Sequence, residues 1–159
     1  MKRETLILGL GNDILMDDGI GIRLCREMQR IFAGDHIDFE VLSLGGLEIL
    51  EFIGGYRNVI FIDAIKTGDG IPGTVYCFTP ADFKETSNLS NLHDVSFLTA
   101  LEIGKKLHMQ VPEQLHIIAV EIIEDLTFGV DFSPEIQSMY PEIIVQVQRM
   151  IQDIIEKIA

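Results

Sequence analysis

The sequence predicts an α/β fold: a three-layer sandwich with a twisted, mostly parallel sheet of about five strands and helices on both faces. Two observations predict it. Apolar runs of strand length alternate along the chain with segments whose apolar residues recur at helical spacing. The strongest strand segments are continuously apolar, as in strands covered on both faces. The chain has 159 residues and no internal repeat or linker-like tract, so we expect a single domain over residues 1–159.

The first 65 residues are predicted to alternate strands and helices. The expected elements are a strand at 5–10, a helix at 18–32, a strand at 37–44, a short helix at 46–54 and a strand at 58–65. The short helix is expected to end at Gly54 and Gly55. The segment 58–65 is the strongest strand prediction, and we expect it to be central and buried.

The rest of the chain is predicted to hold two further strands. The expected elements are a strand at 74–78 ended by Pro80, an irregular segment at 81–92, a helix at 94–107, a strand at 114–121, a loop at 122–133 and a helix at 135–158. The connection 66–73 is too short for a parallel crossover. We therefore expect the strand 74–78 to run antiparallel at an edge of the sheet.

The composition of the chain limits the kinds of binding partner and the location that we expect. Twelve basic residues against 25 acidic ones give a formal net charge of −13, which argues against a nucleic-acid or anionic-membrane partner. The first apolar run stops at a glycine and is too short for a signal peptide, and no stretch reaches the roughly 18 apolar residues of a membrane span. We therefore expect a cytoplasmic protein without membrane insertion. Cys25 and Cys77 are expected to be buried free thiols, since no CxxC pattern occurs.

Ligands in open α/β sheets bind beyond the carboxyl ends of the strands, which directs attention to the segment after the first strand. Ile14 stands where a dinucleotide-binding motif needs its third glycine, and the pair Asp17-Asp18 would repel a pyrophosphate. Carboxylates at this junction suit a cation better. We expect Asp17 to cap the helix and Asp18 to carry function, while the simpler alternative is that both only cap the helix.

Two further candidates follow other predicted elements. Asp63 lies at the end of a buried strand, where an uncompensated carboxylate is costly, although an aspartate in a turn that binds its own backbone is the simpler alternative. His93 stands directly before a predicted helix, where a hydrogen bond to a backbone carbonyl would also explain it. His36, His108 and His116 lack a comparable setting.

Two carboxylates and one imidazole, if they converge, form an incomplete ligand set for a first-row divalent ion and leave coordination positions open. Such a set suits a metal that arrives with another molecule better than a stored one. An aspartic-protease dyad is a variant of this site, but the Asp-Thr/Ser-Gly signature is absent.

The motifs resemble those of a known family, the nickel-iron hydrogenase maturation endopeptidases. The matching residues are Gly9-Leu10-Gly11-Asn12, Asp17-Asp18-Gly19 and Gly21 in the first block, Asp63-Ala64 and Pro72-Gly73-Thr74 in the second, and His93 in the third. The resemblance implies an endopeptidase that removes the C-terminal extension of a nickel-iron hydrogenase large-subunit precursor after nickel insertion. It implies that Asp18, Asp63 and His93 are both the metal contacts and the catalytic residues. It also implies that the substrate supplies the nickel, that other divalent ions substitute in vitro, and that no organic cofactor is used.

Two segments depart from the family pattern. The segment Ser43-Leu44-Gly45-Gly46 lacks the aspartate usual before the two glycines, and Val120-Glu121-Ile122 lacks the usual proline. We assign substrate binding to Gly11, Asn12, Gly45, Gly46 and Glu121.

Two routes for the cleavage stay open from the sequence. Either the nickel polarises the scissile carbonyl and activates a water, or a carboxylate acts as general base. The alternative function is a nickel-dependent checkpoint or chaperone that binds the precursor without cutting it.

Overall fold

The computed structural model describes residues 3–43, 47–85 and 92–159, with side chains described outside residues 83–98. Five strands form one sheet in the order β2-β1-β3-β5-β4. Their bounds are Arg3–Leu10 for β1, Ile37–Leu42 for β2, Tyr56–Ile65 for β3, Val75–Phe78 for β4 and Gln114–Glu121 for β5. The pairings of β1, β2, β3 and β5 are parallel, and β4 pairs antiparallel with β5 at the edge. The predicted sheet, including its antiparallel edge strand, is confirmed.

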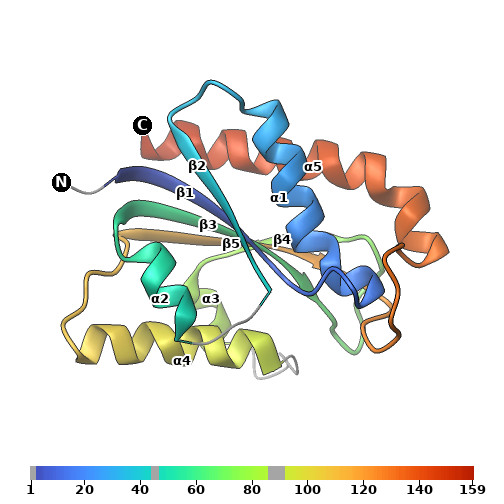
Figure 1. Cartoon of the computed structure of the whole chain (residues 1–159), viewed down its shortest axis with the longest axis horizontal. Coiled ribbons are helices and arrows are strands. Elements are labelled where there is room, and N and C mark those ends of the chain that lie inside the picture. Colours follow the sequence, from blue (N-terminus) through green and yellow to red (C-terminus); the bar gives the residue numbers. More distant parts are fainter. Residues whose placement is uncertain (1–2, 44–46, 86–91) are drawn as a thin grey trace.

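Helices cover both faces of this sheet (Figure 1). Their bounds are Met16–Gly19 for the 3₁₀ turn η1, Ile20–Ile31 for α1, Glu48–Ile53 for α2, Pro80–Glu85 for α3, Leu92–Lys106 for α4 and Pro134–Ile158 for α5. α1 and α5 lie on one face, α2 and α4 lie on the other, and α3 packs beside β4 and β5. No helix in the described part of the chain is both long and apolar enough to span a bilayer.

The alternation of side chains along the strands divides the core into two clusters, because successive residues point to opposite faces of a sheet. On β3, Ile60 and Ile62 pack under α1 and α5, whereas Val59 and Phe61 pack under α2 and α4. The long helix α5 contributes a buried stripe at helical spacing to the first cluster, consisting of Ile136, Tyr140, Ile143, Val147, Ile151 and Ile154.

Two expectations about the fold were wrong. Part of the segment 81–92, expected to be irregular, forms α3. Thr79 precedes the helix, and the carboxylate of Asp82 accepts hydrogen bonds from the backbone N–H of Thr79 at 2.7 Å and from its hydroxyl at 3.1 Å; the first of these is one of the two bonds of a capping box. Cys77 was expected to be buried but is exposed, because β4 is a short edge strand. Cys25 is buried as expected; both thiols are free, and burial raises the pKa of Cys25 to about 11.

Candidate active site

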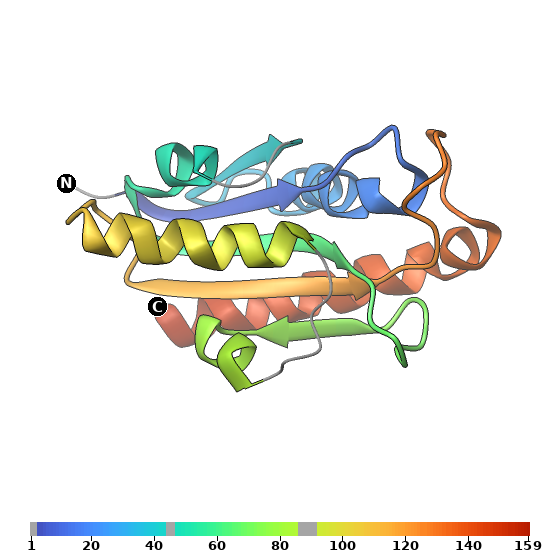
Figure 2. The ribbon, with the colours of Figure 1, turned by 90° about the horizontal axis from the view of Figure 1, so that it is seen from below.

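Three connections gather where β1, β3 and β5 end. They are the segment that contains η1 after β1, the loop 66–74 after β3 and the loop 122–133 after β5, and Figure 2 shows them together at the end toward which these arrows point. The backbone N–H of Ile122 donates to Ile65 O at 2.9 Å, and that of Met16 donates to Gly129 O at 2.9 Å. These bonds tie the three connections into one continuous edge. Most of the predicted site residues belong to this edge.

Asp18 is held by the turn that precedes it. The backbone N–H of Asn12 donates both to the carboxylate of Asp18 at 3.0 Å and to its backbone oxygen at 3.3 Å. Gly11 makes this closure possible, since its φ is +144° and a Cβ added there would lie 2.1 Å from Asp18 O. Gly11 and Asn12, which the sequence assigned to substrate binding, therefore position Asp18. Their contact with a substrate stays a prediction.

Asp17 does not cap a helix, contrary to our expectation. Neither η1 nor α1 has a side-chain cap. Asp17 is fully buried, and its carboxylate accepts hydrogen bonds from the backbone N–H groups of Ile123, Glu124 and Ser133 at 3.2, 3.0 and 2.7 Å, and from the Ser133 hydroxyl at 2.8 Å. The residue is structural, as predicted, but it fixes the loop 122–133. Its donors lie more than a hundred positions away, so local sequence contained no signal for them.

Asp63 is a buried carboxylate on the central strand. It pairs with Ala119 of β5, and its Oδ1 accepts a hydrogen bond from the backbone N–H of Ala64 at 2.8 Å. Alternation along β3 places Asp63 on the face of Val59 and Phe61, which is the face that α4 covers. Asp63 thus binds a neighbouring backbone group, as the simpler alternative held, but from within a strand rather than a turn. Its functional role stays a prediction.

Gly21 brings the Asp18 and Asp63 segments together. A Cβ added at Gly21, three residues after Asp18, would lie 2.2 Å from Leu10 O, 2.4 Å from Ile62 O and 3.1 Å from Asp63 Cα. The first turn of α1 therefore rests directly on the ends of β1 and β3. This close approach places two buried carboxylates at one end of the sheet.

Replacing Gly21 by alanine is expected to destabilise the chain by about 3 kcal/mol or more, because the clashing atoms belong to two backbones that cannot move independently. The free energy of unfolding in urea measures the effect. Gly55→Ala is the control, since a Cβ at Gly55 meets nothing within 4 Å. Equal stability of the two variants would show that α1 does not need this contact.

Glu121 ends β5 and fastens the loop 66–74. Its buried carboxylate accepts hydrogen bonds from the backbone N–H of Thr67 at 2.9 Å and from the Thr67 hydroxyl. Gly70 packs against the same carboxylate, where a Cβ would overlap it. Burial, followed by the charge of Glu121, raises the pKa of Tyr76. Glu121 therefore fixes the loop beside Asp63, and its predicted contact with substrate stays untested.

Replacing Glu121 by alanine is expected to loosen the loop 66–74, because Thr67 loses its acceptor and Gly70 loses its packing partner. Trypsin should then cut after Lys66 about tenfold faster, since cleavage follows the opening of the loop. Glu113→Ala, at an exposed ion pair with Arg57, is the control and should leave the rate unchanged. An unchanged rate in Glu121→Ala would mean that other contacts hold the loop.

The remaining candidates fall outside what is described. Gly45 and Gly46 lie outside the described residues, and so does the side chain of His93. His93 is the second residue of α4, whose first turn lies toward the same end of the molecule as the carboxyl ends of β1, β3 and β5 (Figure 2). Among the described side chains, no three His, Cys, Asp or Glu residues gather as a metal site.

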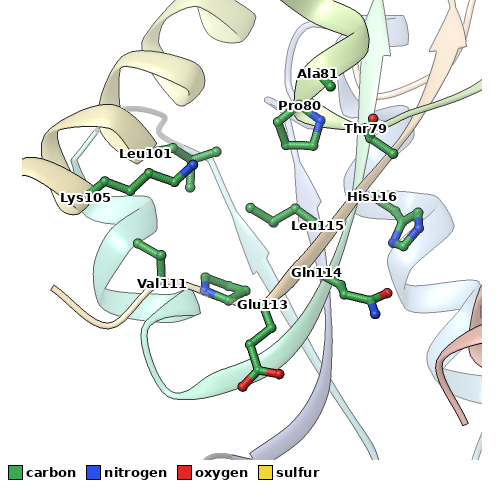
Figure 3. A pocket seen from close by; sticks show the side chains of 11 residues that line it. Thr79, Pro80, Ala81, Leu101, Lys105, Val111, Glu113, Gln114, Leu115 and His116 are labelled. Atoms are coloured by element: carbon green, nitrogen blue, oxygen red, sulfur yellow. The ribbon is translucent and has the colours of Figure 1, made fainter. Parts of the chain in front are cut away.

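A pocket of about 330 Å³ lies between α3, α4 and the beginning of β5 (Figure 3). Lys105, Leu115 and His116 are among the residues that line it. Because it adjoins the amino end of β5, it is remote from Asp18 and Asp63. None of the predicted site residues lines it.

Comparisons with known proteins converge on one family. The family model described as hydrogenase maturation protease, HycI, matches residues 22–158. The hydrogenase 2 maturation protease of Escherichia coli (strain K12) is 27% identical over 149 residues, which cover 91% of this chain and 88% of that protein. Protein FrxA of Pyrococcus furiosus is 31% identical over 142 residues, covering 84% of this chain and 96% of that protein.

Solved structures share the fold. The hydrogenase maturating endopeptidase HybD from E. coli has a TM-score of 0.75 and 22% identity, with 96% of this chain and 93% of that chain covered. The NiFe hydrogenase maturation protease HybD from Thermococcus kodakarensis has a TM-score of 0.69 and 22% identity, with 94% and 99% covered.

Proposed function

Because the chain belongs to the hydrogenase maturation protease family and is a peptidase, we propose that it removes the C-terminal extension of a nickel-iron hydrogenase large-subunit precursor after nickel insertion. In this proposal Asp18, Asp63 and His93 contact the nickel that the precursor carries. The chain would thereby recognise, and cleave, only a precursor into which nickel has been inserted.

One observation carries the proposal: Gly21 seats the turn that contains Asp18 against the strand that contains Asp63. Both carboxylates are buried there, at 5% and 7% exposure, at the end of the sheet where ligands bind in such folds. A cation that arrives with the substrate would interact favourably with two carboxylates in this buried setting. α4, which begins one residue before His93, approaches the same end.

The ligand set explains why the nickel would belong to the substrate. Two carboxylates and one imidazole supply too few ligands to complete the coordination of a first-row divalent ion. The precursor's own ligands would fill the other positions, so a stable contact would require a loaded precursor.

Hydrolysis requires a water to attack the scissile carbonyl, and two routes use the same residues. In the first route, the substrate's nickel polarises the carbonyl, and Asp18, Asp63 and His93 hold the nickel in place. In the other, one of the two carboxylates accepts the proton of the attacking water. Both routes need the carboxylates to be ionised and fixed, and Asn12 and Ala64 donate backbone hydrogen bonds that fix them.

The experiment is to incubate the chain with purified nickel-loaded and nickel-free precursor and to record the intact mass of the large subunit. The proposal predicts loss of a C-terminal peptide from the loaded precursor and an unchanged mass for the nickel-free one. Equal cleavage of the loaded and the nickel-free precursor would show that the chain does not recognise nickel. A stable complex of unchanged mass would support the checkpoint alternative, which the named proteases among the relatives disfavour.

A further inference from the structure

Four large apolar side chains are exposed beside the candidate site. Leu126, Phe128 and Val130 in the loop 122–133 are 82%, 79% and 70% exposed, and Ile14 in the turn after β1 is 50% exposed. Leu15 and Gly129 form a parallel bridge, and the backbone N–H of Gly129 donates to Ile14 O at 2.9 Å. Ile14 and Phe128 therefore occupy neighbouring positions on two paired segments. We call Ile14, Leu126, Phe128 and Val130 the apolar rim.

The loop that displays the apolar rim is fixed at both ends. Asp17 binds the backbone at Ile123, Glu124 and Ser133. Phe132 is buried, with the guanidinium of Arg23 3.8 Å from its ring centre and the ring of Tyr140 4.9 Å from it.

The middle of the loop is also held. Glu124 accepts hydrogen bonds from the backbone N–H groups of Leu126 and Thr127 at 2.9 and 3.0 Å, and Asp125 pairs with Lys66 at 3.1 Å. The loop's backbone is thus bound while its apolar side chains face water. Such preorganisation lowers the entropic cost of binding a partner.

The charges around the apolar rim indicate the kind of partner. Residues 11–19 and 122–133 contain six acidic residues, Asp13, Asp17, Asp18, Glu124, Asp125 and Asp131, and no basic residue. Asp17 and Asp18 are buried, and Arg26 and Lys66 pair with Asp13 and Asp125, so Glu124 and Asp131 are the acidic side chains outside these contacts. A partner that covers this surface is expected to present apolar side chains flanked by Lys or Arg, because acidic side chains there would be repelled.

We propose that the apolar rim is the surface on which the hydrogenase large-subunit precursor docks, through a segment of apolar and basic side chains. The inference rests on the proposed function, since the occupant is the peptidase's substrate. The rim is continuous with the site, because Asp17, which fastens the loop, directly precedes Asp18. A precursor docked there lies next to the carboxylates that act on it.

The test is the double variant Leu126→Ser/Phe128→Ser, measured for binding of the full-length precursor in an Asp63→Asn background and for cleavage without that substitution. Docking on the rim predicts a dissociation constant about tenfold higher or more, with KM raised and kcat within about twofold of the unmodified chain. The melting temperature should not change, because both side chains are exposed. Leu107→Ser, which is 66% exposed after α4 at the opposite end of the sheet, is the control and should bind normally.

The outcomes separate the two proposals. Normal cleavage together with an unchanged dissociation constant in the double variant overturns the docking surface and leaves the function standing. Weakened binding of a precursor that the unmodified chain never cuts supports the docking surface and removes the proposed function. A precursor that fails to bind, or an apolar rim that instead joins two copies of this chain in sedimentation, overturns the docking surface. Raised salt concentration should weaken the binding of a basic docking segment, because salt screens charge attraction. Binding that does not depend on salt would overturn the basic character of that segment.

Discussion

Replacing Asp63 by asparagine is expected to lower the rate of precursor cleavage by about a thousandfold or more while leaving the fold intact. Asparagine has the same shape, and its side-chain oxygen can still accept the hydrogen bond from the backbone N–H of Ala64. The substitution removes the negative charge, which both routes to water attack require, and replaces the second acceptor oxygen by an NH₂ group. Single-turnover cleavage of nickel-loaded precursor measures the rate, and thermal unfolding checks the fold.

Asp38→Asn is the matched control for that experiment. Asp38 lies on the edge strand β2, where it binds Tyr56 and Arg3, and it is far along the sheet from the carboxyl-end loops. Its substitution should leave the cleavage rate unchanged. A folded Asp63→Asn variant that cleaves as fast as the Asp38→Asn variant would remove Asp63 from the mechanism.

Replacing Asp17 by alanine is expected to cost about 3–5 kcal/mol of stability, which makes it the largest structural effect in the site. The carboxylate is fully buried and accepts four hydrogen bonds, from Ile123 N, Glu124 N, Ser133 N and the Ser133 hydroxyl. Its removal leaves buried donors without an acceptor, and such donors cost more than the bonds contribute. Asp17→Asn should be nearly as damaging, because an amide NH₂ would face these donors.

Urea unfolding measures the loss, and hydrogen exchange at residues 123, 124 and 133 locates it. Asp13→Ala is the control. Asp13 is partly exposed in the same connection and lies 3.7 Å from Arg26, so its loss should cost no more than about 1 kcal/mol. Protection of the loop amides that survives in Asp17→Ala would mean that the packing of Phe132, rather than Asp17, fixes the loop.

The fold was predictable because its signals are local. β3 is a continuous apolar run, and α5 has apolar residues at helical spacing. Both patterns follow from the regular geometry of the element itself, so they can be recognised without knowing which residues pack against it. The antiparallel edge strand followed from the length of the connection 66–73 alone. α3 was missed because its signals, Pro80 at the first position and the pair Thr79 and Asp82, directly follow a strand and are also typical of a turn.

The site was predictable only in part, because its contacts are not local. Asp18 and Asp63 could be predicted to lie at one edge of the sheet, because each is near the carboxyl end of a predicted parallel strand. The role of Asp17 depends on a loop that follows β5, and the role of Glu121 depends on Thr67 and Gly70, 54 and 51 positions away. The contacts of Asp17 and of Glu121 could not be inferred from the sequence, because they depend on the strand order β1-β3-β5, which places those loops side by side.

The most direct test of a shared nickel site is anomalous diffraction at the nickel edge from crystals of the chain in complex with the nickel-loaded precursor. A peak is expected within bonding distance of the Asp18 and Asp63 carboxylates and the His93 imidazole together. His36, His108 and His116 provide internal competitors elsewhere in the chain. A nickel peak at one of those three, with none joining Asp18, Asp63 and His93, would contradict this expectation.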